Sequence, residues 1–343
     1  MHSARRHTNS FRKGDAEMKR RHVLSGAVTF ALAFLLPTGL SAQPNTRKIV
    51  IGLLDAGERV EGWDAFRQQL RELGYVEGRN VSFEQRFAKG RPEALPALAN
   101  ELVELKVAVI VTTASAAAIA AEHASHKIPI VMATGGDQVS RGLATSLARP
   151  GGNVTGVTSL TADLMGKRFE LLRELVPKSA RVAALWHADN TPSMASVREL
   201  DGSAARARVA FQSYRIRGAA ELGDAFSAMR RERIDAVVVV NSPLVYLERK
   251  RIAELALKHR LPAIYGEAEY VDAGGLLAYG PSYPELFRRA AIYVDKILKG
   301  ANPADLPIEQ PTTFELVINA NTARALGLVI PPSMLARANR VIQ

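Results

Sequence analysis

Polar side chains recur in this sequence directly after short runs of β-branched and aliphatic residues, where a buried strand would end. Thr112, Thr113 and Ser115 follow one such run. Hydroxyl groups at this position can cap the helix that follows, or they can join its free N–H groups in holding an anion such as a carboxylate. Open α/β sheets bind ligands outside the carboxyl ends of their strands, so these residues are candidates for a binding site.

Acidic residues take the same position after other strand-like runs. Asp137 comes after Ile128–Ala133, Glu267 after Pro262–Tyr265, and Asp55 at the end of the first run in the chain. A carboxylate that faces a cleft can bind a ligand ammonium group, although helix capping or a surface ion pair is the commoner role. No Gly-x-Gly-x-x-Gly motif follows Asp55, so this residue is expected at the floor of a cleft and not in a dinucleotide site.

Carboxamides and aromatic rings complete the set of candidates. Asn190 and Asn241 follow strand-like runs in the second half of the chain, where asparagine also suits a plain turn. Tyr246 and Tyr270 could stack on an aromatic ligand, whereas the helical spacing around Trp63 favours core packing. The sequence therefore predicts nine ligand-binding residues: Asp55, Thr112, Thr113, Ser115, Asp137, Asn190, Asn241, Tyr246 and Glu267.

Signatures of catalysis and of metal binding are missing from the sequence. There is no Gly-x-Ser-x-Gly elbow, no Gly-Lys-Ser/Thr phosphate loop and no His-Glu-x-x-His pair. His123 and His126 share a predicted helix but are better explained as a solvated helix end than as a metal site. We expect a protein that is not an enzyme and has neither cofactor nor metal; a hydrolase without a recognised motif is the alternative.

Composition limits the remaining classes. The chain has 343 residues, of which 47% are hydrophobic, enough for two domains with cores of their own. Its formal charge is +11, but no basic run alternates with aromatic residues, so nucleic-acid binding is not expected. The absence of cysteine excludes disulfides, thiol catalysis and a lipid-modified anchor.

Residues 1–42 have the pattern of an extension followed by an export signal. Met18 is a candidate start, and a basic cluster precedes the apolar run Val23–Leu36. The small residues Ser41 and Ala42 offer a cleavage point. The run is shorter than the roughly 20 residues that a membrane span needs, which favours a cleavable signal of the Sec or Tat type over an uncleaved anchor.

After the signal, strand-like and helix-like segments alternate in two similar successions. This alternation predicts an α/β protein with two doubly wound, parallel-sheet lobes. Between the two successions we expect a helix at Val139–Leu147, then the turn Arg149–Asn153, where the chain leaves one lobe for the other. Near the end of the chain, Leu306–Gln310 is predicted as an edge strand.

Three motifs resemble one family. They are RPGGNVTG (Arg149–Gly156), ELGYVEGRNV (Glu72–Val81) and LPALANELVELKV (Leu95–Val107), and the likeness extends from about Lys48 to about Leu335. Together they are similar to substrate-binding proteins of ABC importers in the tryptophan/tyrosine-binding subgroup. The chain departs from that family at Asp137-Gln138, where Asp-Pro is usual, so the conformation of this loop is not carried over.

The resemblance implies a type I periplasmic-binding fold with a multi-strand hinge whose closure traps a small solute, such as an aromatic or branched amino acid. By analogy with amino-acid receptors of this architecture, Ser115 would bind the carboxylate and Glu267 the amine. The implied lobes are residues 47–156 with about 278–311, and residues 157–277 with about 312–343.

The implied partners are the small-molecule ligand and an ABC permease in the inner membrane, for a monomeric periplasmic protein without nucleic acid. A periplasmic sensing subunit for a membrane kinase is the alternative with the same fold. A sugar-responsive transcription regulator would need a helix-turn-helix segment where this chain has its apolar leader.

Overall fold

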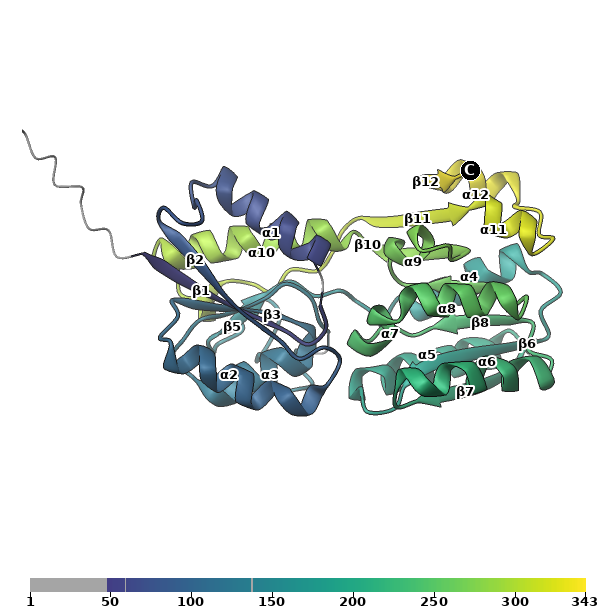
Figure 1. Ribbon diagram of the computed structural model, residues 1–343, viewed down its shortest axis with the longest axis horizontal. Helices are drawn as coiled ribbons and strands as arrows, with labels where there is room; N and C mark the ends of the chain where they lie inside the picture. The colour runs from purple at the N-terminus through teal and green to yellow at the C-terminus, as the bar shows by residue number, and fades with distance from the viewer. Residues whose placement is uncertain (1–47, 59, 137) are drawn as a thin grey trace, which may run out of the picture. The chain divides into compact units, whose positions relative to one another are not determined.

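The computed structural model describes residues 48–58, 60–136 and 138–343, and in them two β-sheets are each covered by helices (Figure 1). The expected leader, residues 1–42, and the candidate Asp137 lie outside the described residues. In the described part of the chain, no helix combines the length and the apolar character that crossing a membrane requires.

The first sheet has five strands, all parallel, in the order β2-β1-β3-β4-β5. All residues of β3, β4 and β5 are buried, which is why these strands appear in the sequence as continuous apolar runs and not as alternating patterns. The strands are β1 (Ile49–Asp55), β2 (Val81–Phe87), β3 (Val109–Thr113), β4 (Ile130–Met132) and β5 (Val154–Gly156).

Helices cover both faces of this sheet (Figure 1). On one face α1 (Val60–Glu72) packs against α10 (Tyr283–Leu298), a helix far away in the sequence, and the Trp63 and Phe287 rings meet edge to face with centroids 5.0 Å apart. The other face is covered by α2 (Leu95–Glu104), which follows the 3₁₀ turn η1 (Pro92–Ala94), and by α3 (Ala114–Ala124).

The second sheet has seven strands in the order β12-β11-β10-β9-β8-β6-β7. Every neighbouring pair is parallel except β10 and β11, which are antiparallel. The two sheets therefore confirm the predicted α/β class with two doubly wound halves. The first half is the five-stranded sheet with the helices that cover it, and the second half is the seven-stranded sheet with its helices. The strands are β6 (Arg181–His187), β7 (Ala210–Ile216), β8 (Ala236–Val239), β9 (Ala263–Tyr265), β10 (Leu277–Pro281), β11 (Phe314–Asn319) and β12 (Arg340–Ile342).

Two apolar clusters bury the faces of the second sheet. The first cluster joins it to α4 (Met165–Leu175), α5 (Thr191–Arg206), α11 (Ala320–Ala325) and α12 (Pro332–Arg337). The second joins it to α6 (Leu222–Arg231), which follows the 3₁₀ turn η2 (Ala219–Glu221), and to α7 (Pro243–Leu247), α8 (Arg249–Lys258) and α9 (Ala268–Asp272).

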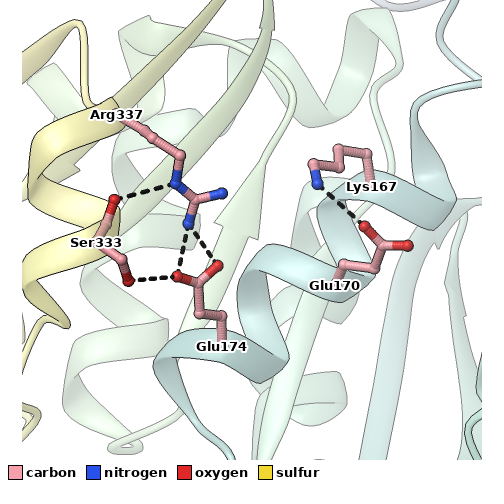
Figure 2. A network of polar contacts seen from close by, with 5 residues as sticks. All are labelled: Lys167, Glu170, Glu174, Ser333 and Arg337. Atoms are coloured by element: carbon pink, nitrogen blue, oxygen red, sulfur yellow. Dashed lines mark hydrogen bonds and ion pairs between the residues drawn. The ribbon is translucent and has the colours of Figure 1, made fainter.

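Polar contacts attach the C-terminal helix α12 to α4 (Figure 2). Arg337 Nη2 lies 2.6 Å from each carboxylate oxygen of Glu174, and Ser333 Oγ donates to the same carboxylate over 3.2 Å. The hydrogen bond from Arg337 holds the pKa of Glu174 below its usual value. Figure 2 also shows the separate pair Lys167–Glu170, which joins only residues of α4.

The chain passes three times between the two sheets: after β5, between β10 and α10, and ahead of β11. The predicted edge strand at Leu306–Gln310 is wrong. After the 3₁₀ turn η3 (Pro303–Asp305) this segment makes one isolated bridge, Val157–Glu309, because Pro307 has no N–H to donate to a ladder. Arg289 of α10 holds the segment in place through a bidentate ion pair with Glu309.

The predicted helix at Val139–Leu147 is also wrong, since this segment forms consecutive turns. Gly142 has a φ of +73°, and Thr145 Oγ1 donates to the carbonyl oxygen of Arg149 over 2.8 Å. Ser146 accepts from the Arg149 N–H over 3.0 Å. Such local hydrogen bonds from side chains give the backbone an alternative to helical hydrogen bonds. The apolar residues Leu143 and Ala144 of this segment are nevertheless buried, as they would be in an amphipathic helix.

Candidate functional site

The loops after β3 and β4 are tied together at the start of α3. The Ala114 N–H donates to Thr134 Oγ1 over 3.1 Å. Ser115 Oγ donates to the Gly136 carbonyl over 2.7 Å and accepts from the Gly136 N–H over 3.1 Å. The Ser115 hydroxyl is therefore a link between two strand ends, a role beyond the simple N-cap that the sequence suggests.

Gly135 allows this close approach. Its φ is +140°, and a Cβ at this position would lie 2.4 Å from Met132 Cε and 3.2 Å from Ser115 Oγ. Its carbonyl accepts from Thr158 Oγ1 over 2.9 Å and from Ser159 Oγ over 3.1 Å. The ends of β3, β4 and β5 thus form one hydrogen-bonded rim.

Two residues near this rim have a strained backbone. Ala114 has a φ of +61° and Leu160 a φ of +48°, in the left-handed region that costs a residue with a side chain free energy. Strain of this kind is retained where the surrounding structure needs a particular geometry, and it concentrates at binding sites.

The second half contributes carboxamides from its own strand ends. Asn190 follows β6, and its Nδ2 donates to Ser193 Oγ over 2.7 Å. Asn241 follows β8, and its Nδ2 donates to Glu267 Oε1 over 2.5 Å. The Asn241 Oδ1 is buried and has no hydrogen-bond partner.

These strand ends line one cavity of about 340 Å³, which we name the first cavity. Its walls come from both halves of the chain and are rich in hydroxyl groups and carboxamides. Asp163 is exposed and is the one charged side chain among the described lining residues. The lining residues are Thr113, Ala114, Ser115, Thr134, Gly135, Gly136, Gln138, Val139, Ser140, Leu147, Thr158, Ser159, Leu160, Thr161, Ala162, Asp163, Asn190, Pro192, Ser196, Asn241, Ser242, Pro243, Tyr283 and Gln310.

Three long helices begin at this cavity. The lining residues Ala114, Asp163 and Pro192 stand at or just before the first turns of α3, α4 and α5. A helix N-terminus has free N–H groups and carries a partial positive charge, so the first cavity favours an anionic group close to its wall.

The structure brings four of the nine predicted residues to this cavity: Thr113, Ser115, Asn190 and Asn241. Asp55, Thr112, Tyr246 and Glu267 do not line it, and Asp137 falls outside the described residues. Thr112 is fully buried within β3, with an unpartnered hydroxyl, because its side chain lies inside the sheet layer and not beyond the strand end.

Asp55 does not line the first cavity but stabilises its wall through hydrogen bonds. The carboxylate is fully buried and accepts from Trp63 Nε1 over 2.8 Å, from the Gly57 N–H over 2.7 Å and from the Thr113 hydroxyl. Thr113 in turn accepts from the Ala56 N–H over 3.1 Å. These contacts fix Thr113, and they place the Trp63 ring in the core, as the helical spacing predicts.

Tyr246 links elements of the two halves. It is buried, its hydroxyl donates to Glu61 Oε2 over 3.3 Å, and the guanidinium of Arg249 lies 4.5 Å from its ring centroid. Arg249 also reaches Glu61, with a distance of 3.5 Å between Nη2 and Oε1. The ring is thus held against α1 instead of facing the first cavity.

Glu267 stands beside a buried cation that the sequence analysis did not single out. Arg168 of α4 is 1% exposed, and its Nε donates to the Tyr279 carbonyl over 2.8 Å. Burial lowers the pKa of Arg168 to about 10, a shift that electrostatic interactions with Tyr283 and Glu267 oppose. Glu267 therefore fixes the Asn241 carboxamide next to a buried positive charge.

The segment Thr158–Asp163 is the largest part of the cavity wall that the sequence analysis missed. Residues just beyond the carboxyl ends of parallel strands tend to form the binding site, which we call the strand-end rule. The segment follows β5 directly, so the rule that predicts Thr113 and Asn241 applies to it as well. Tyr283 and Gln310 carried no comparable signal, because they belong to the segments by which the chain passes between the sheets.

In the described ranges, no three His, Cys, Asp or Glu side chains gather closely enough to hold a metal ion. The hydroxyl and carboxamide walls suit hydrogen bonding to a small polar molecule.

The profile of the family described as ABC transporter substrate binding protein matches residues 50–342. A curated relative, the tyrosine-binding protein of Clostridioides difficile (strain R20291), is 27% identical over 263 residues, which are 77% of this chain and 75% of the relative.

Two solved structures of bacterial proteins are similar to most of this chain. A protein from Streptococcus pneumoniae in complex with L-Trp is 25% identical, with a TM-score of 0.80, over 86% of this chain and all of that one. A conserved domain protein from Vibrio cholerae is 27% identical, also with a TM-score of 0.80, over the same shares.

Proposed function

We propose, since the chain belongs to the family of ABC transporter substrate-binding proteins, that it binds an aromatic amino acid in the first cavity and delivers it to an importer. The observation that carries the proposal is the meeting of strand ends and helix N-termini from both halves at a cavity with one described charge, Asp163. The relatives that bind tyrosine and tryptophan support the choice of ligand.

The ligand carboxylate would lie at the start of α3. Ala114 and Ser115 are in the first turn there, whose N–H groups lack partners within the helix, and the dipole of the helix favours a negative charge. Ser115 thus keeps the role expected from the sequence through the backbone of its turn, while its hydroxyl donates to the Gly136 carbonyl and fixes the loop beside it.

The ligand ammonium would pair with Asp163. Glu267, for which the sequence predicts this role, is buried next to Arg168 and does not line the first cavity. Asp163 lines it and is exposed before a ligand enters. A charge-assisted hydrogen bond to an ammonium group would form there as the site closes.

Closure would trap the ligand between two lobes. We assign residues 47–156 to the first lobe, with α10 from the returning segment expected at about 278–311. Residues 157–277 with about 312–343 form the second lobe, to which β10 also belongs because it pairs within the second sheet. The three passages of the chain between the sheets would act as the hinge. A ligand that contacts both lobes binds the closed form better and so shifts the population toward it.

Delivery needs export and a membrane partner. The family membership and the leader pattern of residues 1–42 support a periplasmic location, with the closed form docking on an ABC permease. The work of such a protein is differential affinity of its open and closed states, not bond making.

Isothermal titration of the purified protein with phenylalanine, tyrosine and tryptophan tests the proposal. We expect binding of at least one, and a loss of about 10–100-fold in affinity for Asp163→Asn, because hydrogen bonds to charged groups are worth about 1.5–3 kcal/mol. Asp201→Asn makes the same charge change on an exposed face of α5 and should leave the affinity unchanged. No heat with any of the three amino acids would overturn the proposal.

A further inference from the structure

A second cavity of about 280 Å³ adjoins the first. The two cavities share three lining residues: Asn190, Pro192 and Pro243. The walls of the second cavity are mostly apolar, from Ala56, Leu95, Pro96 and the middle of α3.

Helix α3 extends past both cavities. Ala114 and Ser115 line the first, and Ala116, Ile119, Ala120 and His123 line the second. The latter four residues have the i, i+3, i+4, i+7 spacing of one helix face. On the opposite face Ala117, Ala118 and Ala121 are fully buried in the core.

The small side chains of this face leave room beside the helix. Ala120 lies five residues beyond Ser115, which is about 7.5 Å along a helix axis. One aromatic side chain can span that distance. A ligand whose carboxylate lies at the start of α3 can therefore place its ring against Ala116, Ile119 and Ala120.

Two buried polar atoms stand at the second cavity without partners. They are His187 Nδ1, in a residue that is 4% exposed, and Arg141 Nε. The two residues come from different halves of the chain, His187 from the end of β6 and Arg141 from the turns after β4. A buried polar group without a partner is costly, so a ligand group that hydrogen-bonds to either atom would gain affinity.

Burial lowers the pKa of His187, and the charge of Asp189 opposes this shift, so the imidazole is neutral at pH 7. In a neutral imidazole Nδ1 either accepts a hydrogen bond or donates one, and a hydroxyl can satisfy either form. Arg141 Nε is a donor only, so its partner must be an acceptor. A hydroxyl is the small neutral group that can do both.

We propose that the second cavity is a subsite for the ring of an aromatic ligand and that His187 and Arg141 select a ring with a terminal hydroxyl, a phenol. The inference rests on the proposed function, because the first cavity must hold the amino-acid end of the same ligand. The ligand class is then an amino acid with a para-hydroxylated aromatic side chain.

Titration of tyrosine and phenylalanine into the wild-type protein and into His187→Leu tests the subsite. The wild type should bind tyrosine about 10–100-fold more tightly than phenylalanine, because only tyrosine satisfies the buried polar atoms. In His187→Leu the preference should fall at least tenfold while the affinity for phenylalanine stays within twofold. This variant removes an unpaired buried nitrogen, so it should fold at least as well as the wild type.

His259→Leu is the matched control, since this histidine lines neither cavity and should leave the tyrosine preference intact. Arg141→Met is a second, independent variant and should also reduce the preference. Equal binding of tyrosine and phenylalanine by the wild type, or an unchanged preference in both variants, would overturn the subsite alone. Absence of binding to either amino acid would overturn the proposed function as well.

Discussion

Each half of the molecule has an acid at or just after a strand end near the first cavity, and the two acids have different partners. Asp55 in the first half accepts hydrogen bonds from Trp63, Gly57 and Thr113, which are neutral donors. Glu267 in the second half accepts from Asn241 and stands beside the buried cation Arg168. In each half the acid positions a neutral side chain that lines the cavity, so an acid at a strand end is not by itself a ligand-binding residue.

The largest effect on stability is expected in the second half. Glu267→Gln keeps the shape of the side chain but removes the negative charge beside Arg168, which is 1% exposed. Leaving a buried charge uncompensated costs about 3–5 kcal/mol, so the free energy of unfolding in urea should fall by that amount. Glu254→Gln, at an exposed position of α8, should stay within about 0.5 kcal/mol of the wild type.

The double variant Glu267→Gln/Arg168→Met distinguishes charge compensation from simple packing. If the two charges depend on each other, the double variant should lose less stability than the sum of the two single variants. Strict additivity would contradict the pairing of these buried groups and with it the contrast between the halves.

A smaller loss is expected in the first half. Asp55→Asn keeps the size of the side chain but turns one acceptor into an NH₂ group that faces a donor. One unsatisfied buried donor costs about 1–3 kcal/mol, which urea unfolding would show directly. Asp64→Asn, at an exposed position of helix α1, is the control and should change stability by less than about 0.5 kcal/mol. A loss for Asp55→Asn as large as that for Glu267→Gln would erase the difference between the halves.

The smallest effect concerns the C-terminal elements, which belong to the second half. Arg337→Ala removes both contacts to Glu174 and should lower the free energy of unfolding by about 0.5–1 kcal/mol, because the two side chains are 47% and 32% exposed. Lys167→Ala removes the neighbouring pair of Figure 2, which lies within one helix, and should cost less than about 0.5 kcal/mol. Equal losses would show that the contact between α12 and α4 adds nothing.

The sequence predicts the sheets well because buried parallel strands give continuous apolar runs. The strand-like runs Ile128–Ala133 and Pro262–Tyr265 contain β4 and β9, respectively. The failures are local. At Val139–Leu147 the apolar spacing is that of a helix, but Gly142 and the hydroxyls of Thr145 and Ser146 favour turns, and a pattern of burial does not reveal such hydrogen bonds.

The candidate site was predictable only in part. The strand-end rule identifies Thr113, Ser115, Asn190 and Asn241, all of which line the first cavity. It cannot show whether an acid at a strand end faces the cavity or accepts hydrogen bonds from residues of the cavity wall, because that depends on which hydrogen-bond donors the neighbouring elements supply. Arg168 gave no signal either, since an arginine in an amphipathic helix normally faces water.

If strand ends of both halves bind one ligand, a crystal structure of the protein with L-tyrosine will show it. We expect the ligand carboxylate at Ala114 and Ser115, the ammonium at Asp163, and a contact with Asn190 or Asn241 from the other half. A ligand bound outside the first cavity, or held by residues of one half alone, would contradict it.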